Sequence, residues 1–280
     1  MSPVHLVTDS TADLTTAAAA ELGVRVVPLT VRFGEEQFRD GVDIDSDAFY
    51  QRLAHTAEQP TTSQPSPEQF RETYAELLSD PGAEVVSIHI SGKLSGTLQS
   101  AHLAAAELDG SRLHLVDSLS VSGGLQLLVR AAVADVRAGG DAATVAARAE
   151  ERRAKLGIYV LLDTLTYLQR GGRIGRAQAL VGSLLNVKPV LTVDDGEVAP
   201  AARVRSRRQG LEAIVDQLRR RLPLQGLAAF HCGAPALLPE LRELLSPLAP
   251  GLEVVAGQVG PVVGAYTGPG GVGIACLGAD

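Results

Sequence analysis

The chain has 280 residues, of which 45% are hydrophobic, so it is long enough for two α/β domains with aliphatic cores; aromatic residues are only 4% and tryptophan is absent. The 25 Lys and Arg against 32 Asp and Glu give a net charge of -7, which argues against a protein whose main task is gripping nucleic acid. Cys232 and Cys276 lie far apart without ligand spacing, so we expect buried, reduced thiols. With neither a signal peptide nor a run long enough for a membrane span, we expect a cytoplasmic protein.

The first half alternates strand-like and helix-like segments. Strands are predicted over residues 4–10, 24–33, 84–90 and 112–118, with Pro28 marking an edge or a bulge in the second. Helices are predicted over 15–22, 46–56 with Ser46 as N-cap, from Pro67 onward with a Ser66–Gln69 capping box, 124–138 and 141–155. Strands separated by helices favour right-handed crossovers and a mainly parallel sheet.

The second half has a different pattern. Residues 188–204 contain Asp194-Asp195-Gly196 between β-rich runs, which predicts a hairpin. A helix is predicted over 206–222, with an apolar face of Leu211, Ile214, Val215, Leu218 and Leu222. A strand at 226–233 and a helix at 235–245 precede a tail of short strands and glycine turns.

The predicted fold is therefore α/β with two domains. The first, residues 1–155, is expected to be a mainly parallel sheet flanked by helices. The second, residues 156–280, is expected to be α+β with a mixed sheet. No long linker marks the boundary, so it is placed where the helix near 141–155 ends and the next strand begins.

A hydroxyl-rich loop, SGKLSGT at 91–97, follows a buried strand and opens a helix. It is not a Walker A loop, because Gly92-Lys93 is followed by Leu94, and it is not a nucleophile elbow, because the first glycine before Ser95 is missing. Two interpretations stay open. The helix N-terminus and the hydroxyls hold a carboxylate or phosphate, or Ser95 simply caps its helix.

A second hydroxyl cluster, PTTSQPSP at 60–67, precedes the capped helix. Loops at the carboxyl ends of parallel strands converge on one crevice, so Thr62, Ser63 and Ser95 are expected to meet around one ligand head group. The alternative is a solvated loop, the commoner fate of such a segment.

Three other segments are rich in glycine or arginine. QRGGRIGRA at 169–177 is compatible with bidentate anion contacts by Arg170, Arg173 and Arg176, or with a helix end bearing solvated arginines. RVRSRR at 203–208 suits a phosphate or partner contact, or a solvated face. The glycine-dense stretch at 260–273 either lets a ligand approach the backbone or forms β-turns with Tyr266 half-buried.

No metal site and no catalytic constellation stand out in the sequence. The histidines have no partner at ligand spacing, and His89 in its strand is interpreted as a core or surface residue. Asp9, Asp117 and Asp163 each end a strand, where a carboxylate caps a helix or orients a hydroxyl. The residues by themselves predict two α/β domains with converging Ser, Thr, Gly and Arg loops.

Seven segments, taken in order, resemble the DegV family of bacterial lipid-binding proteins. They are VTDSTADL (7–14), PTTSQPSPEQF (60–70), ISGKLSGTLQSA (90–101), VDSLSVSGG (116–124), LQRGGRI (168–174), KPVLTVDDGEVAP (188–200) and GPVVGAYTGPGGVG (260–273). They span nearly the whole chain, and it is their shared order that makes the resemblance specific.

The resemblance implies a non-enzymatic protein that binds one long-chain fatty acid, such as palmitate, in an apolar tunnel between the two domains and needs no other cofactor. It places Thr62, Ser95 and Gly96 in the motifs that hold the carboxylate, with Ser63 beside them. Arg173 and Arg205 fall where basic residues are common in the family. Tyr266 stands where the family usually has histidine, and it donates a hydrogen bond without a positive charge.

Some members of the family present the fatty acid to a separate ATP-dependent fatty-acid kinase, so such a kinase is the expected protein partner. Two alternatives remain. One is a phosphotransferase or hydrolase acting on a small anion, against which the missing base and metal site count. The other is a lipid-sensing regulatory module that signals through the basic run at 203–208.

Overall fold

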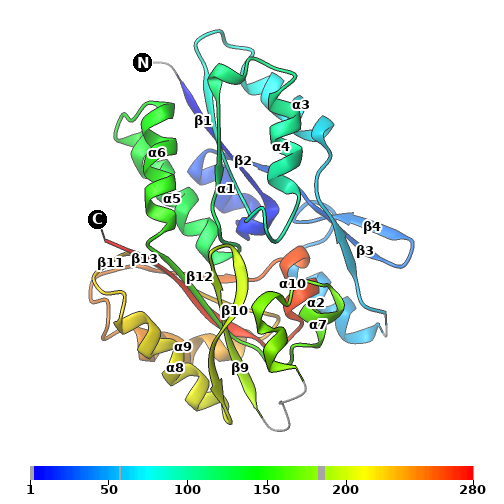
Figure 1. Cartoon of the computed structure of the whole chain (residues 1–280), viewed down its shortest axis with the longest axis vertical. Coiled ribbons are helices and arrows are strands. Elements are labelled where there is room, and N and C mark those ends of the chain that lie inside the picture. Colours follow the sequence, from blue (N-terminus) through cyan, green and yellow to red (C-terminus); the bar gives the residue numbers. More distant parts are fainter. Residues whose placement is uncertain (1–2, 57, 182–186, 280) are drawn as a thin grey trace.

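The computed structural model describes residues 3–56, 58–181 and 187–279, and its strands form three sheets (Figure 1). The strands are β1 (Val4–Asp9), β2 (Val24–Val27), β3 (Thr30–Phe33), β4 (Glu36–Arg39), β5 (Thr61–Ser63), β6 (Glu84–His89), β7 (Leu113–Asp117), β8 (Leu156–Leu161), β9 (Lys188–Asp194), β10 (Glu197–Val204), β11 (Leu224–His231), β12 (Val254–Gln258) and β13 (Val272–Gly278). The α-helices are α1 (Thr16–Leu22), α2 (Ser46–His55), α3 (Pro67–Leu77), α4 (Thr97–Ala105), α5 (Gly123–Arg137), α6 (Ala142–Arg153), α7 (Thr166–Arg170), α8 (Arg207–Arg219), α9 (Leu238–Leu245) and α10 (Pro261–Thr267). Short 3₁₀ helices are η1 (Ser10–Ala12), η2 (Gly110–Arg112), η3 (Gly175–Leu180) and η4 (Pro235–Leu237).

The first sheet is parallel, in the order β2-β1-β6-β7, as the alternation of strands and helices predicts. Helices α3 and α4 cover one face of this sheet, and α5 and α6 cover the other (Figure 1). Each strand of such a sheet ends at the same edge, so the segments that follow β1 and β6 are neighbours in space. This edge carries η1 and the loop at residues 90–96.

The second sheet is mixed, in the order β10-β9-β8-β13-β11-β12, which confirms the predicted α+β half. Helices α8 and α9 pack on this sheet, and α5 contacts both the first and the second sheet. The predicted hairpin joins β9 to β10 through Asp195 and Gly196, whose φ angles are +49° and +77°. Positive φ at both central residues is what a two-residue hairpin turn demands, and glycine supplies the second at little cost.

The third sheet, β4-β3-β5, is antiparallel and was not predicted. The strand expected over 24–33 breaks at Pro28, so that β2 lies at the edge of the first sheet and β3 lies in the third. The expected loop at 60–67 is wrong in part. Residues Thr61–Ser63 form β5, because Thr62 pairs with Val31 across an antiparallel ladder that no local pattern reveals.

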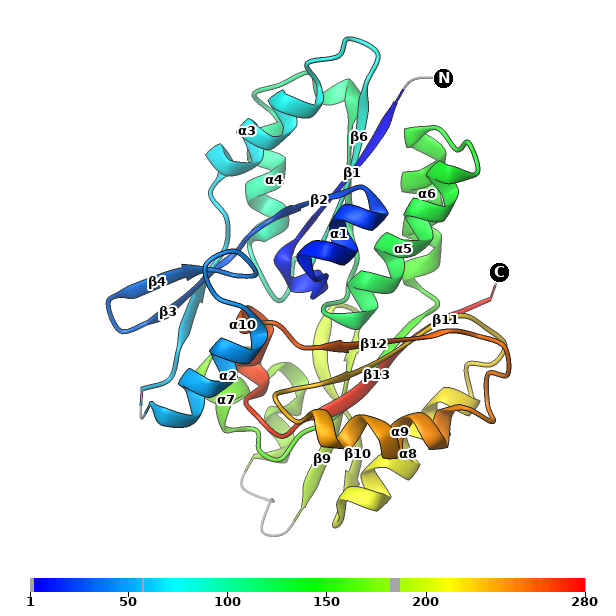
Figure 2. The ribbon, with the colours of Figure 1, turned by 180° about the vertical axis from the view of Figure 1, so that it is seen from behind.

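Helix α2 and the third sheet pack on the second half of the chain. Phe33, Phe49 and Tyr50 share one buried apolar cluster with Phe230 and Val262, and Figure 2 shows α2 beside α10. All strands of the second sheet lie beyond residue 155, but this packing ties residues 29–53 to them. The proposed division into 1–155 and 156–280 stays a prediction.

Several local predictions can be checked against the side chains. The capping box of Ser66 and Gln69 is confirmed, whereas α2 is capped by Asp45, whose carboxylate accepts from the Ala48 amide, and not by Ser46. Leu222 lies beyond the end of α8 and is 40% exposed, so it does not belong to the buried face of that helix.

Both cysteines are buried and free, as expected. Within the described residues, no helix has both the length and the apolarity that a membrane crossing requires.

Candidate functional site

A cavity of about 450 Å³ lies where the edge of the first sheet, β5, the second sheet and α10 meet. Its walls are mostly aliphatic, and the apolar residues that line it are Leu29, Ile90, Leu94, Val121, Ile158, Val160, Leu162, Leu168, Leu191, Val193, Val198, Phe230, Val259, Val262 and Val263. Cys232 also lines it, and burial raises the pKa of its thiol to about 11, so the thiol is neutral. The volume and the aliphatic lining suit a small, flexible apolar ligand.

The polar residues of the wall gather around the two hydroxyl clusters. The Thr62 and Tyr266 hydroxyls are 2.5 Å apart and hydrogen-bonded. The Arg173 guanidinium lies 5.1 Å from the centre of the Tyr266 ring and donates from Nε to the Leu94 carbonyl at 3.2 Å. Since Leu94 precedes Ser95 in the chain, these contacts link Thr62 to the loop of Ser95.

The second link between the clusters runs through Gln64. Gly96 faces the Gln64 side chain so closely that an added Cβ would lie 2.2 Å from Gln64 Oε1, and Gln64 Nε2 also donates to the Ser100 hydroxyl. A side chain at position 96 would therefore require the flexible end of Gln64 to move. Gly96 itself is not part of the cavity wall.

Ser95 does not act as the N-cap of α4. The N-cap position is Gly96, without a side-chain cap, while the Ser95 hydroxyl accepts from the Thr97 amide at 3.3 Å and pairs with the Thr97 hydroxyl at 2.8 Å. The two hydroxyls carry two protons, and the hydrogen bond between them uses one. The other proton can be donated to a ligand.

The predicted site residues separate into two groups. The structure brings Thr62, Ser63, Ser95, Arg173 and Tyr266 to one cavity, and their contact with a ligand stays a prediction. Gly96 lies behind the wall, and Arg205, whose amide donates to Gln209 Oε1 at the start of α8, is not among the lining residues. Thr11, Gln64 and Ser122 also line the cavity and were not predicted to.

Thr11 and Ser122 lie in two of the seven motif segments named above, residues 7–14 and 116–124. The signal that could have identified both residues is their position after the end of a strand. Thr11 follows β1 by two residues, and Ser122 precedes α5 in the stretch after β7. Ser122 has a φ of +53°, an uncommon angle for a residue with a side chain, and its hydroxyl donates to Asp13 Oδ2 at 2.5 Å.

Two carboxylic acids lie below the wall near the start of α10. Burial raises the pKa of Asp40 to about 7. Hydrogen bonds from the Ser10 hydroxyl and the Val262 amide lower this pKa, but their effect is smaller than that of burial. Desolvation raises the pKa of Asp13 well above its usual range, although this side chain keeps partial solvent exposure. Asp13 accepts from the Gly260 amide at 2.9 Å, so both acids hold the first turn of α10, which carries Tyr266.

The hairpin turn of the second sheet, residues 195–196, contacts the loop at residues 90–96 that carries Ser95. The Ser91 hydroxyl donates to the Gly196 carbonyl at 2.8 Å, and Lys93 Nζ lies 2.7 Å from Asp195 Oδ2. The Cβ of an alanine at position 196 would lie 2.4 Å from Ser91 Oγ. This contact joins the two sheets beside the polar part of the cavity.

Gly196→Ala is therefore expected to destabilise the protein by roughly 2–4 kcal/mol, from left-handed backbone strain plus the clash with Ser91. Gly23→Ala is the matched control, because Gly23 has a φ of +71° but nothing within 4 Å of the added Cβ, so about 1–2 kcal/mol is expected. Chemical denaturation measures both. Equal losses would show that the Ser91 contact carries no weight, and Ser91→Ala with Gly196→Ala should lose less than the sum of the single losses.

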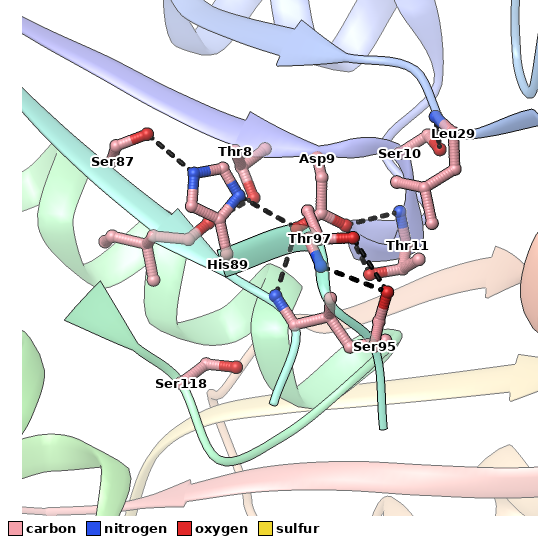
Figure 3. Close-up of polar contacts among 12 residues, drawn as sticks. Thr8, Asp9, Ser10, Thr11, Leu29, Ser87, His89, Ser95, Thr97 and Ser118 are labelled. Carbon is pink, nitrogen blue, oxygen red and sulfur yellow. Dashed lines mark hydrogen bonds and ion pairs between the residues drawn. The ribbon is translucent and has the colours of Figure 1, made fainter. Parts of the chain in front are cut away.

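Among the described residues, no group of three or more His, Cys, Asp or Glu is placed to hold a metal ion. His89 Nδ1 lies 2.9 Å from Asp9 Oδ2, and both side chains are fully buried (Figure 3). The arrangement offers hydroxyl donors, one exposed guanidinium and a cavity with mostly aliphatic walls. It suits a ligand with a small polar head and a hydrocarbon chain.

Comparison with known proteins agrees with this geometry. The model of the DegV family, described as uncharacterised proteins, matches residues 3–278. A DegV domain-containing protein of Streptomyces coelicolor is 38% identical over 275 residues, covering 97% of each chain.

Among solved structures, a DegV family protein of Thermus thermophilus, described as binding fatty acid, has 39% identity and a TM-score of 0.90 over 100% of both chains. The DegV protein of Bacillus subtilis, described as a fatty acid binding protein, has 30% identity and a TM-score of 0.90, also over 100% of both. A stearic acid-binding protein of Eubacterium ventriosum has 25% identity and a TM-score of 0.90 over 98% of each chain.

Proposed function

The chain belongs to the DegV family, and we propose that it binds one long-chain fatty acid in the cavity described above and carries or presents it for lipid metabolism. The observation that carries the proposal is a cavity of about 450 Å³ with aliphatic walls and one linked group of Thr62, Ser95, Arg173 and Tyr266. The neighbours described as fatty-acid-binding proteins share the whole fold with it.

The energetics fit a lipid ligand. A dozen or more methylenes, each worth about 0.8 kcal/mol when buried, supply on the order of 10 kcal/mol before the costs of association. The head group then has only to orient the chain. Ser63 and Arg173 are exposed while Thr62, Ser95 and Tyr266 are half-buried, so the polar head lies toward solvent and the chain runs inward.

We infer a binding protein and not an enzyme, located in the cytoplasm and with the fatty acid as its one ligand. The hydroxyls near the head group lack a hydrogen-bonded base, since Ser95 pairs with Thr97 and Thr62 pairs with Tyr266. The delivery of the ligand to a separate fatty-acid kinase is proposed from the family resemblance. Turnover of a phosphorylated or esterified substrate by the purified chain, lost in Ser95→Ala, would contradict the binding role.

A direct test compares palmitate with its methyl ester, which has the same chain but no acidic head group. Displacement of a fluorescent fatty acid should give an affinity for the ester at least roughly tenfold weaker, because one or two head-group hydrogen bonds are lost. Equal affinities would place the head group elsewhere. Failure of every long-chain acid to bind would remove the function itself.

A further inference from the structure

Phe230 lies in the wall of the cavity described above and also lines a second, much smaller pocket. The second pocket has a volume of about 10 Å³, which is the room of a single water molecule. Ser122 and Phe230 line both spaces, so these two residues form a partition between them. Because serine is small, the ring of Phe230 makes up most of the partition.

The alternation of side chains along β11 sets the direction of the ring. Leu227 and Ala229 belong to the buried cluster that includes residues of α8 and α9, on one face of the second sheet. Phe230 projects from the other face. It pairs with Gly273 of β13, which pairs with Val160 of β8, so Phe230 and Val160 share that face. Both residues line the cavity, as this arrangement requires.

Three glycines surround the ring and fix its position. An added Cβ at Gly273 would lie 2.9 Å from Phe230 Cε2 and Cζ, and one at Gly123 would lie 3.1 Å from Phe230 Cδ1. The ring is therefore held between β13 and the first turn of α5, which packs over these strands (Figure 2). Gly257 pairs with Phe230 on β12, and an added Cβ there would have nothing within 4 Å. The open side of the ring thus faces β12, where Gly257 lines the second pocket.

The polar residues of the cavity wall lie on other elements than Phe230. Thr62 is on β5 and Tyr266 is on α10, whereas the exposed Arg173 follows α7. Phe230 is 6% exposed and belongs to a buried apolar cluster that includes Ile158. A hydrocarbon chain whose head group lies at the polar residues therefore runs toward buried apolar side chains, and the ring of Phe230 closes the cavity where the second pocket begins.

We propose that Phe230 sets the longest acyl chain that the cavity accepts, with the terminal methyl group of the fatty acid in contact with its ring. This inference rests on the proposed function and deepens it by naming the residue that determines chain length. In the parent chain, carbons beyond this length gain no further burial. A smaller side chain at position 230 frees the space of the ring for additional methylenes, and each newly buried methylene raises the affinity about fourfold.

Displacement of a fluorescent fatty acid from the delipidated full chain by myristate, palmitate, stearate and arachidate measures the preferred length. In Phe230→Leu and Phe230→Ala, the affinity for arachidate relative to palmitate should rise roughly tenfold or more, as two or more methylenes gain burial. The leucine variant keeps an apolar side chain, so it provides the test if the alanine variant does not fold. An unchanged ratio in a variant that binds palmitate would overturn the inference and leave the fatty-acid function intact. Absence of binding by the parent chain would instead reject the function.

Two further variants separate the role of the ring from a general loosening of the core. Phe70→Leu is the matched control, because it removes the same atoms from a fully buried ring on α3 that does not line the cavity. It should leave the ratio unchanged, and an equal rise there would contradict the inference.

Gly257→Val is the compensating variant, because it adds methyl groups to the second pocket at a position whose φ lies outside the left-handed region. Combined with Phe230→Leu, it should remove part of the gain for arachidate. A combined variant that keeps the full gain would place the end of the acyl chain elsewhere.

Discussion

Replacing Ser95 by alanine and Thr62 by valine together is expected to weaken fatty-acid binding by roughly 30- to 1,000-fold, because two ligand hydrogen bonds worth about 1–2 kcal/mol each are lost. Each single variant should lose less, since Thr97 and Tyr266 stay in place as hydroxyl partners. Displacement of a fluorescent fatty acid measures all three variants. The chain length preferred by the protein should not change, because the aliphatic walls are untouched.

The control for this pair removes the same atoms away from the cavity. Ser111→Ala and Thr73→Val delete hydroxyls that bond Asp109 and the Gln69 carbonyl, and neither residue lines the cavity. Their combination should bind as the parent chain does. If the Ser95 and Thr62 double variant also binds like the parent, the head-group assignment is wrong.

Asp40→Asn is expected to stabilise the protein at pH 8 by on the order of 4 kcal/mol. This gain is reduced by whatever the amide loses as a hydrogen-bond acceptor. Asp40 is 4% exposed, its Oδ2 has no hydrogen-bond partner among the described residues, and burial raises its pKa from 3.8 to about 7. The folded chain therefore binds this proton more tightly than the unfolded chain. The stability that the neutral acid provides is full below about pH 4 and is lost as the pH rises to about 7.

Thermal and denaturant unfolding between pH 4 and pH 8 measure the effect. The parent should lose stability across this window through Asp40, and Asp40→Asn should remove that part of the slope, with a gain in Tm of several degrees at pH 8. Glu35→Gln deletes the charge of an exposed side chain and is the control. A gain from Asp40→Asn that is as large at pH 4 as at pH 8 would show that titration of this acid is not the cause.

Features set by neighbouring residues were predictable from the sequence. The capping box of Ser66 and Gln69 and the Asp195-Gly196 turn depend on a few adjacent side chains and φ angles, and both are present. The parallel first sheet and the mixed second sheet follow from the order of strand and helix patterns. Packing did not enter these predictions.

Features set by distant residues were missed. Strand β5 exists because Val31 pairs with Thr62, and α10 forms in a glycine-rich stretch expected to consist of turns. Gly264 packs against α2 so closely that an added Cβ would lie 2.7 Å from the Phe49 ring, which no local propensity encodes. For the same reason the sequence singled out Thr62, Ser95 and Tyr266 by motif but missed Thr11, which lines the cavity only because η1 lies at the edge of the first sheet.

The measurement that tests the account most directly is native mass spectrometry of the purified chain, followed by solvent extraction and fatty-acid analysis of what is released. The account predicts one long-chain fatty acid per chain, lost or reduced in the Ser95 and Thr62 double variant. A protein that is empty as purified and takes up no added fatty acid would contradict it.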